Sequence, residues 1–516
     1  MTADQRQPPP QSEETSRAAI MAADETSQVT LGALRTVISS GWVSRVTALQ
    51  LASIEMLRSC RETSNFRLRI ARKTPRRVYK EKFSGAAGSS RSSGHEVTAV
   101  ESRSRVVLPR IVRLLYDKSE FERTPDWSLP RELVGLVLGT AFGGDIDGVA
   151  WPPALESVVF WRRFNRGIDN VEWPHSLKKL TFGCNFNKPV VAAKWPPELE
   201  ILSFGSWFDQ SLSDVRFPDS LTTLNLGRDF NQPLEGIVWP KRLTHLTFGF
   251  FFNRSIEIAA ENWPPSLRCL SLGDCYNLPV VDVPWPRGLV EISFGRGFNQ
   301  EVEGVTWPPA LRKIKFGGMF DRDIAGAEFP EDMEELELGF AFNRPFVDVM
   351  LPTGLKRLTF GEEFNRSVEG VFWPPGLGEI TFGVQFDMPI AAAAWPRDLR
   401  RLKFSESFNS PLVGVSLPGG LLEIIFGKAF NQEVEEVQWP DSLEVIVFGE
   451  SFNQPIAGVT WPEALTTLRL GCDFDREMKE GVEFPSGLVA VEFVDSYRRV
   501  EERGDQDEAA IAVSPS

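Results

Sequence analysis

The side chains best suited to proton transfer, nucleophilic attack and zinc binding are few and scattered in this chain. Its 516 residues include three His and five Cys. Two pairs fall within a single repeat unit: His175 with Cys184, and Cys269 with Cys275. Neither pair has a third group at a spacing that would orient a nucleophile or complete a metal site. A metal pair at Cys269 and Cys275 is the alternative, but we favour buried thiols.

Glycine-containing segments do not form a phosphate-binding loop either. Gly295-x-Gly297 lacks the third Gly of a dinucleotide loop, and Gly427-Lys428 lacks the upstream Gly and the following Ser or Thr of a P-loop. The sequence therefore predicts no cofactor, no metal and no catalytic residues, and hence a protein that is not an enzyme. An enzymatic site hidden in the irregular unit around 257–262 is the alternative.

Charge divides the chain into two regions. Residues 1–128 carry 21 basic and 14 acidic side chains (+7), and residues 129–516 carry 35 basic and 56 acidic side chains (−21), which sums to the −14 of the whole chain. The basic front contains a dense cluster of cations within 67–82, consisting of Arg67, Arg69, Arg72, Lys73, Arg76, Arg77, Lys80 and Lys82. Such a cluster suits nuclear import, nucleic-acid contact or an anionic membrane surface. The interpretation we favour is a solubilising linker, which could fold back on the acidic body.

A 22-residue repeat organises most of the chain. An apolar residue followed by Pro marks the start of 17 units, and 14 of the 16 intervals between these anchors are 22 residues long. One unit reads W-P-x-x-L-x-x-L-x-F-G-x-x-F-N-x-P-V-x-x-V-x, as after Trp439. The anchors begin at residues 129, 151, 173, 195, 217, 239, 263, 285, 307, 329, 351, 373, 395, 417, 439, 461 and 484.

Each part of the unit has an expected role. The L-x-x-L-x-F segment alternates apolar and polar residues at its centre, which predicts a short strand. The following Gly is expected to supply a backbone angle that a side chain would resist. The Asn or Asp after the second Phe predicts a buried ladder of side chains bonded to backbone turns, and the Trp residues predict an internal stack. Rows of ligand-binding amides or aromatics are the alternatives. Because one unit is too small to fold alone, the units must stack as a solenoid with one parallel sheet.

A ladder of charges supports in-register stacking. The residue four positions before the conserved Gly alternates in sign over seven successive units. In a parallel sheet each of these residues would lie beside its opposite, and any slip in register would spoil the pattern. The alternation also makes this face a poor ligand surface for a long polymer of one charge. The seven residues are Glu291, Lys313, Glu335, Arg357, Glu379, Arg401 and Glu423.

These units resemble the FNIP-repeat family, a leucine-rich-repeat-like group. The motif F-N-x-P-[IVL] appears as FNKPV (186–190), FNQPL (230–234) and FNQPI (452–456), with FNRPF (342–346) as a variant. The segments PHSLKKLTFG (174–183) and PDSLEVIVFG (440–449) also match, and the resemblance covers roughly 129–494. Trp before the anchor Pro departs from the family pattern and suggests a wider coil. The resemblance implies an interaction scaffold without catalytic residues.

The fold class predicted is therefore mostly β, a leucine-rich-repeat-like parallel-sheet solenoid of about 17 coils of 22 residues, with a disordered and partly helical N-terminal extension. We expect disorder over 1–28, a helix within 29–60, and a basic Ser/Gly-rich linker over 61–105. Residues 106–128 are expected to form a degenerate cap repeat, residues 129–497 the solenoid, and residues 498–516 a charged, disordered tail.

The function predicted is a non-enzymatic scaffold for protein–protein interaction, whose partner the sequence does not name. The alternative is an adaptor associated with nucleic acid or the nucleus through 67–82. No apolar run reaches membrane-spanning length, the first thirty residues lack a secretory signal, and an odd number of Cys argues against a disulfide framework. The sequence therefore predicts a cytoplasmic protein without a membrane span, with nuclear entry as the alternative.

Overall fold

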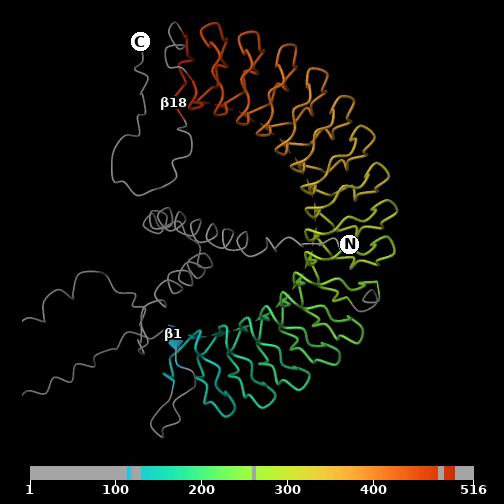
Figure 1. The fold of residues 1–516 in the computed structure, drawn as a ribbon, viewed down its shortest axis with the longest axis vertical. Helices are drawn as coiled ribbons and strands as arrows, with labels where there is room; N and C mark the ends of the chain where they lie inside the picture. Colours follow the sequence, from blue (N-terminus) through green and yellow to red (C-terminus); the bar gives the residue numbers. More distant parts are fainter. Residues whose placement is uncertain (1–112, 117, 119–128, 258–262, 475–481, 494–516) are drawn as a thin grey trace, which may run out of the picture. The chain divides into compact units, whose positions relative to one another are not determined.

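The chain forms a stack of similar coils, each contributing one strand to a single parallel sheet (Figure 1). The computed structural model describes residues 113–116, 118, 129–257, 263–474 and 482–493. All of them belong to one compact unit that spans 66–496 and 509–516. Each strand pairs in parallel with the next strand in the chain, so that residues one repeat apart are backbone neighbours, as Lys313 and Glu335 are. This arrangement confirms the predicted parallel-sheet solenoid.

The described residues contain 18 strands, all of them short. They are β1 (Arg113–Tyr116), β2 (Gly135–Leu138), β3 (Ser157–Phe160), β4 (Lys179–Thr181), β5 (Ile201–Ser203), β6 (Thr223–Asn225), β7 (His245–Thr247), β8 (Cys269–Ser271), β9 (Glu291–Ser293), β10 (Lys313–Lys315), β11 (Glu335–Glu337), β12 (Arg357–Thr359), β13 (Glu379–Thr381), β14 (Arg401–Lys403), β15 (Glu423–Ile425), β16 (Val445–Val447), β17 (Thr467–Leu470) and β18 (Ala490–Phe493).

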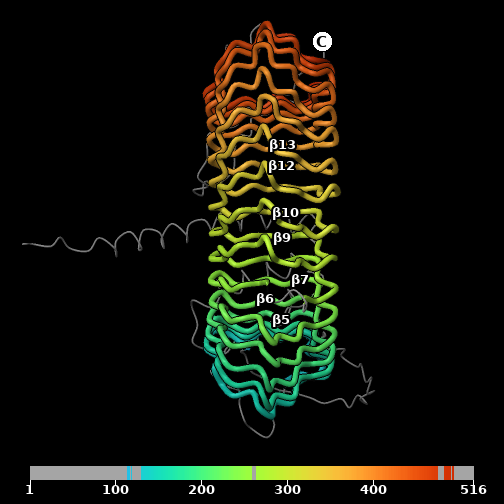
Figure 2. The backbone as a smooth tube through the Cα atoms, turned by 90° about the vertical axis from the view of Figure 1, so that its right-hand side faces the viewer, coloured from blue at the N-terminus to red at the C-terminus, as the bar shows by residue number. Residues whose placement is uncertain are grey.

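Alternation in the sequence decides which side of the sheet is buried. In a three-residue strand such as β9, the central Ile292 is buried and its two neighbours are partly exposed, because successive side chains point to opposite faces. The outward side chains of all strands together form one surface, which we call the strand face. Figure 1 shows the strands on the inner side of the curve made by successive coils, and Figure 2 shows the coils as nearly parallel layers.

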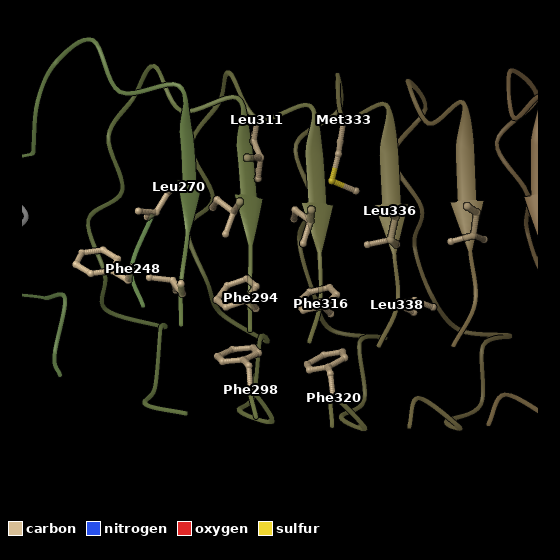
Figure 3. Close-up of a cluster of buried hydrophobic side chains, with 14 of the residues drawn as sticks. Phe248, Leu270, Phe294, Phe298, Leu311, Phe316, Phe320, Met333, Leu336 and Leu338 are labelled. Carbon is tan, nitrogen blue, oxygen red and sulfur yellow. The ribbon is translucent and has the colours of Figure 1, made fainter. Parts of the chain in front are cut away.

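Two columns of Phe fill the core beneath the ends of the strands (Figure 3). Within one coil, Phe294 and Phe298 stack with ring centroids 4.1 Å apart. Between coils, Phe294 stacks on Phe316 at 5.7 Å, and Phe298 stacks on Phe320 at 6.0 Å. Each coil therefore covers the apolar side of the next, which is the contact that a solenoid needs for its stability.

The Trp residues before the anchor Pro form the internal stack that the sequence predicts. Trp285 and Trp307 are buried and stack with centroids 6.1 Å apart. Trp285 also meets the edge of Phe294 at 6.5 Å, and Trp307 continues the column onto Phe329 at 6.4 Å. Aromatic rings held in this way fill the core and do not form a row of exposed ligand-binding groups.

The conserved Gly after each strand serves a different purpose from the one expected. None of these glycines has a positive φ among the described residues; positive values occur elsewhere in the coil, as at Gly304. A Cβ added at Gly317 would lie 1.7 Å from the carbonyl oxygen of Gly295, one coil away. The expectation of a special backbone angle was therefore wrong. Gly is required because the backbones of neighbouring coils approach each other too closely for a side chain.

Several predicted segments lie outside the described residues. These are the disordered 1–28, the helix within 29–60, the linker 61–105 and the charged tail 498–516. Within the predicted cap repeat 106–128, the structure describes strand β1 and Lys118, and β1 pairs with β2 in the same parallel register as the other strands.

Candidate interaction surfaces

The seven residues of the predicted charge ladder lie in one row across the strand face. Strands β9 to β15 pair them as direct backbone neighbours, from Glu291 beside Lys313 through to Arg401 beside Glu423. The register holds because every strand in this stretch is separated from the next by 22 residues. Each charged side chain therefore has only opposite charges beside it in the row.

Ion pairs close four of the six steps of this ladder. They join Lys313 to Glu335 (2.9 Å), Glu335 to Arg357 (2.8 Å), Glu379 to Arg401 (3.8 Å) and Arg401 to Glu423 (3.3 Å). Lys313 turns toward the acidic strand β11, where it also reaches Glu337 at 3.0 Å, and it makes no ion pair with Glu291. Between β10 and β15, most charged side chains of the strand face are therefore paired with one another.

The pKa values in the ladder follow from these contacts. Burial by itself raises the pKa of the Glu335 carboxyl, but hydrogen bonds from Arg357 and Lys313 outweigh burial and lower it. For Lys313, burial lowers the pKa of the ammonium, and hydrogen bonds to Glu335 and Glu337 reverse this and raise it. Both groups are therefore held in their charged forms.

The stacking also brings together a His and a Cys that the sequence analysis did not connect. His245 pairs with Cys269, and Cys269 pairs with Glu291, on strands β7, β8 and β9. The link was missed because an interval of 24 residues separates the two anchors there, although aligning the strand position in every unit would have found it. Burial first, and then the charge of Glu291, raise the pKa of the Cys269 thiol. A thiol held in its protonated form is a weak nucleophile and a weak metal ligand.

The two pairs noted in the sequence, His175 with Cys184 and Cys269 with Cys275, gain no further side chain that would complete a metal site. Cys184, Cys269, Cys275 and Cys472 are all free thiols that are partly exposed, so the expectation of buried thiols at 269 and 275 was wrong in degree. Within the described ranges, no three His, Cys, Asp or Glu side chains come close enough to hold a metal ion.

The turns that follow the strands form a second surface, which we call the turn edge. Here the side-chain oxygen of each Asn or Asp after the second Phe accepts a hydrogen bond from the backbone amide of the equivalent residue in the next coil. Asn277 accepts from Asn299 at 2.9 Å, and Asn299 accepts from Asp321 at 3.0 Å. The series runs unbroken from Asn165 to Asn453. The side chains are half-buried or exposed and not buried as expected, but their role is the predicted one of bonding the turns.

Large apolar side chains are exposed on the turn edge. We call this group the aromatic edge. Trp207 is 55% exposed, and the guanidinium of Arg228 lies over two neighbouring rings, 5.2 Å from the centroid of Phe250 and 5.4 Å from that of Phe251. This group was not predicted from the sequence, although apolar residues just before the second Phe, where most units have polar ones, were the available signal. The aromatic edge consists of Trp207, Phe250, Phe251, Met319 and Phe340.

The basic cluster within 67–82 lies outside the described residues. In the part of the chain that the structure does describe, no helix has the length and apolar composition needed to cross a membrane.

Comparison with known proteins matches the repeats. The profile of the family described as FNIP Repeat matches residues 152–207, 208–251, 342–385 and 408–451. No curated protein sequence matches the chain.

Solved structures show the same architecture. CroV588, described as a novel circular LRR protein, is similar with a TM-score of 0.63 and 35% identity, over 71% of this chain and 57% of that chain. A chain of the Toll–Spatzle complex from Drosophila is similar with a TM-score of 0.53 and 12% identity, over 75% of this chain and 59% of that chain, and this shows the fold alone. The chain thus spans less than two thirds of either. The chain contains FNIP repeats, and its repeats build a leucine-rich-repeat-like solenoid.

Proposed function

We propose that this solenoid is a non-enzymatic protein-interaction scaffold that binds its partner through the turn edge. The observation that carries the proposal is the exposure of the aromatic edge. Large aromatic side chains in contact with solvent are typical anchors of protein interfaces, and Trp and Arg are enriched among the residues that dominate binding energy. Arg228 between Phe250 and Phe251 adds a cation to this apolar surface.

The strand face is a less suitable binding surface than the turn edge, which also favours the turn edge as the site of partner binding. Between β10 and β15, most of its charged side chains already pair with one another, as Lys313 does with Glu335 and Arg401 with Glu423. A partner would have to replace these ion pairs with equally good ones, and an interface made of such exchanges gains little affinity. The aromatic edge, in contrast, gains free energy when water leaves it.

The non-enzymatic part of the proposal rests on the chemistry of the described residues. The His245–Cys269 pair is the nearest approach to a reaction centre, and the raised pKa of its thiol disfavours nucleophilic attack.

Site-specific photocrosslinking tests the proposal. A photoreactive phenylalanine analogue placed at Phe251 should crosslink a discrete partner in an extract of the native cells, and the same analogue at Thr381 on the strand face should not. Substituting Trp207→Ala and Phe250→Ala together in the Phe251 probe should then weaken the crosslink. A partner captured equally from Thr381, or no discrete partner from Phe251, would contradict the turn edge as the binding surface.

The basic cluster within 67–82 carries a second candidate function, contact with nucleic acid or import into the nucleus, because eight cations lie within sixteen residues. The same import signal would decide between a cytoplasmic and a nuclear location. Deleting 67–82 should abolish a salt-sensitive binding signal on single- or double-stranded DNA and shift the protein toward the cytoplasm. Unchanged binding and location after the deletion would remove this candidate.

A further inference from the structure

One turn of the turn edge lacks two hydrogen bonds that all the described turns after it make. In the regular turn, the amide of the second Phe donates to the carbonyl at the Gly position, as Phe186 does to Gly183 (3.1 Å). The preceding amide donates to the coil before it, as Asn185 does to Arg162 (3.1 Å). Both bonds recur in each described turn from 183 to 474, and neither forms in the turn 161–164. The amides of Arg163 and Phe164 are left without these acceptors.

Trp161 explains the loss, because it occupies the position that is Gly in neighbouring coils. At Gly205 an added Cβ would lie 1.7 Å from the carbonyl oxygen one coil back. A side chain at 161 meets the equivalent obstacle, so the turn must move away. Ser405, the other replacement, has a small side chain, and its turn keeps both bonds at the lengths found in Gly turns: 3.4 Å for Phe408 to Ser405, as for Phe386 to Gly383, and 3.1 Å for Ser407 to Val384.

A hollow of about 540 Å³ lies at the distorted turn. It is lined by Thr140, Ala141, Arg162, Arg163 and Asn185. Arg162 and Arg163 are exposed, and among the described residues their guanidinium groups make no ion pair. Two Arg, a Thr and an Asn therefore line one hollow, beside a turn in which the Arg163 amide lacks its usual acceptor.

The charge around the hollow differs from that of the rest of the solenoid. The three equivalent turns 139–145, 161–167 and 183–189 contain four cations and one carboxylate, although residues 129–516 carry a net charge of −21. The carboxylate, Asp145, ends the first turn, and Asp209 lies one coil beyond the third. A long polyanion laid along this edge would meet those carboxylates, whereas a single, compact, doubly charged group would not.

We propose that the hollow binds a phosphomonoester on a serine or threonine of a partner protein. A phosphate carries about −1.5 to −2 charges at neutral pH and three acceptor oxygens. The planar guanidinium groups of Arg162 and Arg163 bind such oxygens bidentately. The Arg163 amide and the Thr140 hydroxyl donate hydrogen bonds to the remaining phosphate oxygen. This inference rests on the proposed scaffold function and specifies the chemistry of one partner.

The aromatic edge supplies a second contact for the same peptide. Trp207 occupies the position in its coil that Arg163 occupies two coils earlier, and it is 55% exposed. The rings that follow these positions, Phe164, Phe186 and Phe208, step by 6.0 Å and 6.1 Å, which places Trp207 about 12 Å along the stack. An extended peptide spans this distance in about three to four residues, so we expect an apolar residue about three or four positions from the phosphorylated one.

Binding of degenerate phosphopeptides to the full-length protein tests the proposal. The probes are fluorescent peptide pools with a fixed phosphoserine or phosphothreonine, the unphosphorylated pools, and pools with Glu in place of the phosphorylated residue. Fluorescence polarisation should show at least tenfold tighter binding of the phosphorylated pools, competition by inorganic phosphate, and weakening by salt. Equal affinity for the unphosphorylated pools would overturn the proposal.

Two variants and a control locate the site. Arg162→Gln with Arg163→Gln should reduce phosphopeptide affinity at least tenfold. Trp161→Gly should do the same while both arginines remain, because the turn regains its hydrogen bonds and the hollow closes. Arg296→Gln, which changes an exposed Arg on the turn edge away from the hollow, should leave the phosphopeptide affinity unchanged. Full affinity in Trp161→Gly would refute the role of the hollow.

Other anionic ligands are distinguished in the same assay. Binding of phosphoinositide vesicles or single-stranded DNA without binding of phosphopeptides would overturn the proposal in favour of a lipid or nucleic-acid site. Crosslinking from Phe251 in the Arg162→Gln/Arg163→Gln variant separates the two levels of inference. If this variant still crosslinks the partner from Phe251 and the wild-type protein binds no phosphopeptide, the scaffold proposal stands and the phosphate site is rejected.

Discussion

The turn edge and the strand face both carry a ladder of polar residues at the same 22-residue spacing, yet the two ladders differ in what they do. On the turn edge, each Asn or Asp accepts a hydrogen bond from a backbone amide in the next coil, as Asn299 does from Asp321. On the strand face, charged side chains meet other side chains, and two of the six steps from Glu291 to Glu423 have no ion pair. The Asn/Asp ladder supplies acceptors to backbone amides that are fixed in the coil. The charge ladder joins side chains that are free to rotate toward water.

This difference predicts unequal contributions to stability. A backbone amide that loses its acceptor keeps its place in the coil and bears the full cost of an unmade hydrogen bond. A surface charge that loses its partner is solvated instead, at a cost of about 0–1 kcal/mol. Repetition alone therefore does not reveal which positions hold the fold together.

The largest effect should come from the close backbone contact at the turn edge. Gly317→Ala places a Cβ 1.7 Å from the carbonyl oxygen of Gly295, so the coils must separate, and the free energy of unfolding should fall by about 3 kcal/mol. Gly419→Ala is the control, because nothing lies within 4 Å of an added Cβ there. Urea denaturation of both variants measures the difference. Equal midpoints would show that inter-coil contact does not explain the Gly column.

A middle-sized effect is expected from the hydrogen-bond ladder. Asn299→Ala removes the acceptor of the Asp321 amide and should lower the free energy of unfolding by about 1–2 kcal/mol. Asn225→Ala, on the strand face, loses only a hydrogen bond to the Ser203 hydroxyl (2.9 Å) and should lose about 0.5 kcal/mol or less. A lower stability of Asn225→Ala than of Asn299→Ala in urea denaturation would contradict this prediction.

The smallest effect should come from the charge ladder. Glu335→Gln removes the centre of the Lys313–Glu335–Arg357 network and should lower the free energy of unfolding by less than about 1 kcal/mol at neutral pH. Because the pKa of Glu335 is lowered in the folded state, its contribution is complete above the ordinary carboxyl pKa and is lost as pH falls through the lowered value.

The pH dependence provides the check on this third prediction. Thermal unfolding of the wild type and of Glu335→Gln should differ most near neutral pH and converge in acid, and 1 M salt should shrink the difference at neutral pH. A difference that grows as pH falls would show that Glu335 is not stabilised in its charged form.

The periodicity of the sequence was sufficient to predict much of the fold. Because residues 22 positions apart must be neighbours once the coils stack, the register of Lys313 beside Glu335 and the internal stack of Trp285 on Trp307 follow from the spacing. Apolar side chains that recur without exception identify the core for the same reason. The resemblance to FNIP repeats was also readable, since it depends on short motifs and not on distances.

Other features depend on distances between atoms of neighbouring coils, and these the repeat does not contain. The turn of Lys313 toward Glu337 and the placement of the Arg228 guanidinium over Phe250 and Phe251 appear only when the coils are placed. The glycine column shows the limit most clearly. The sequence determined where glycine recurs, but only the tertiary structure showed that an approaching carbonyl oxygen excludes a side chain there, because that obstacle belongs to another coil.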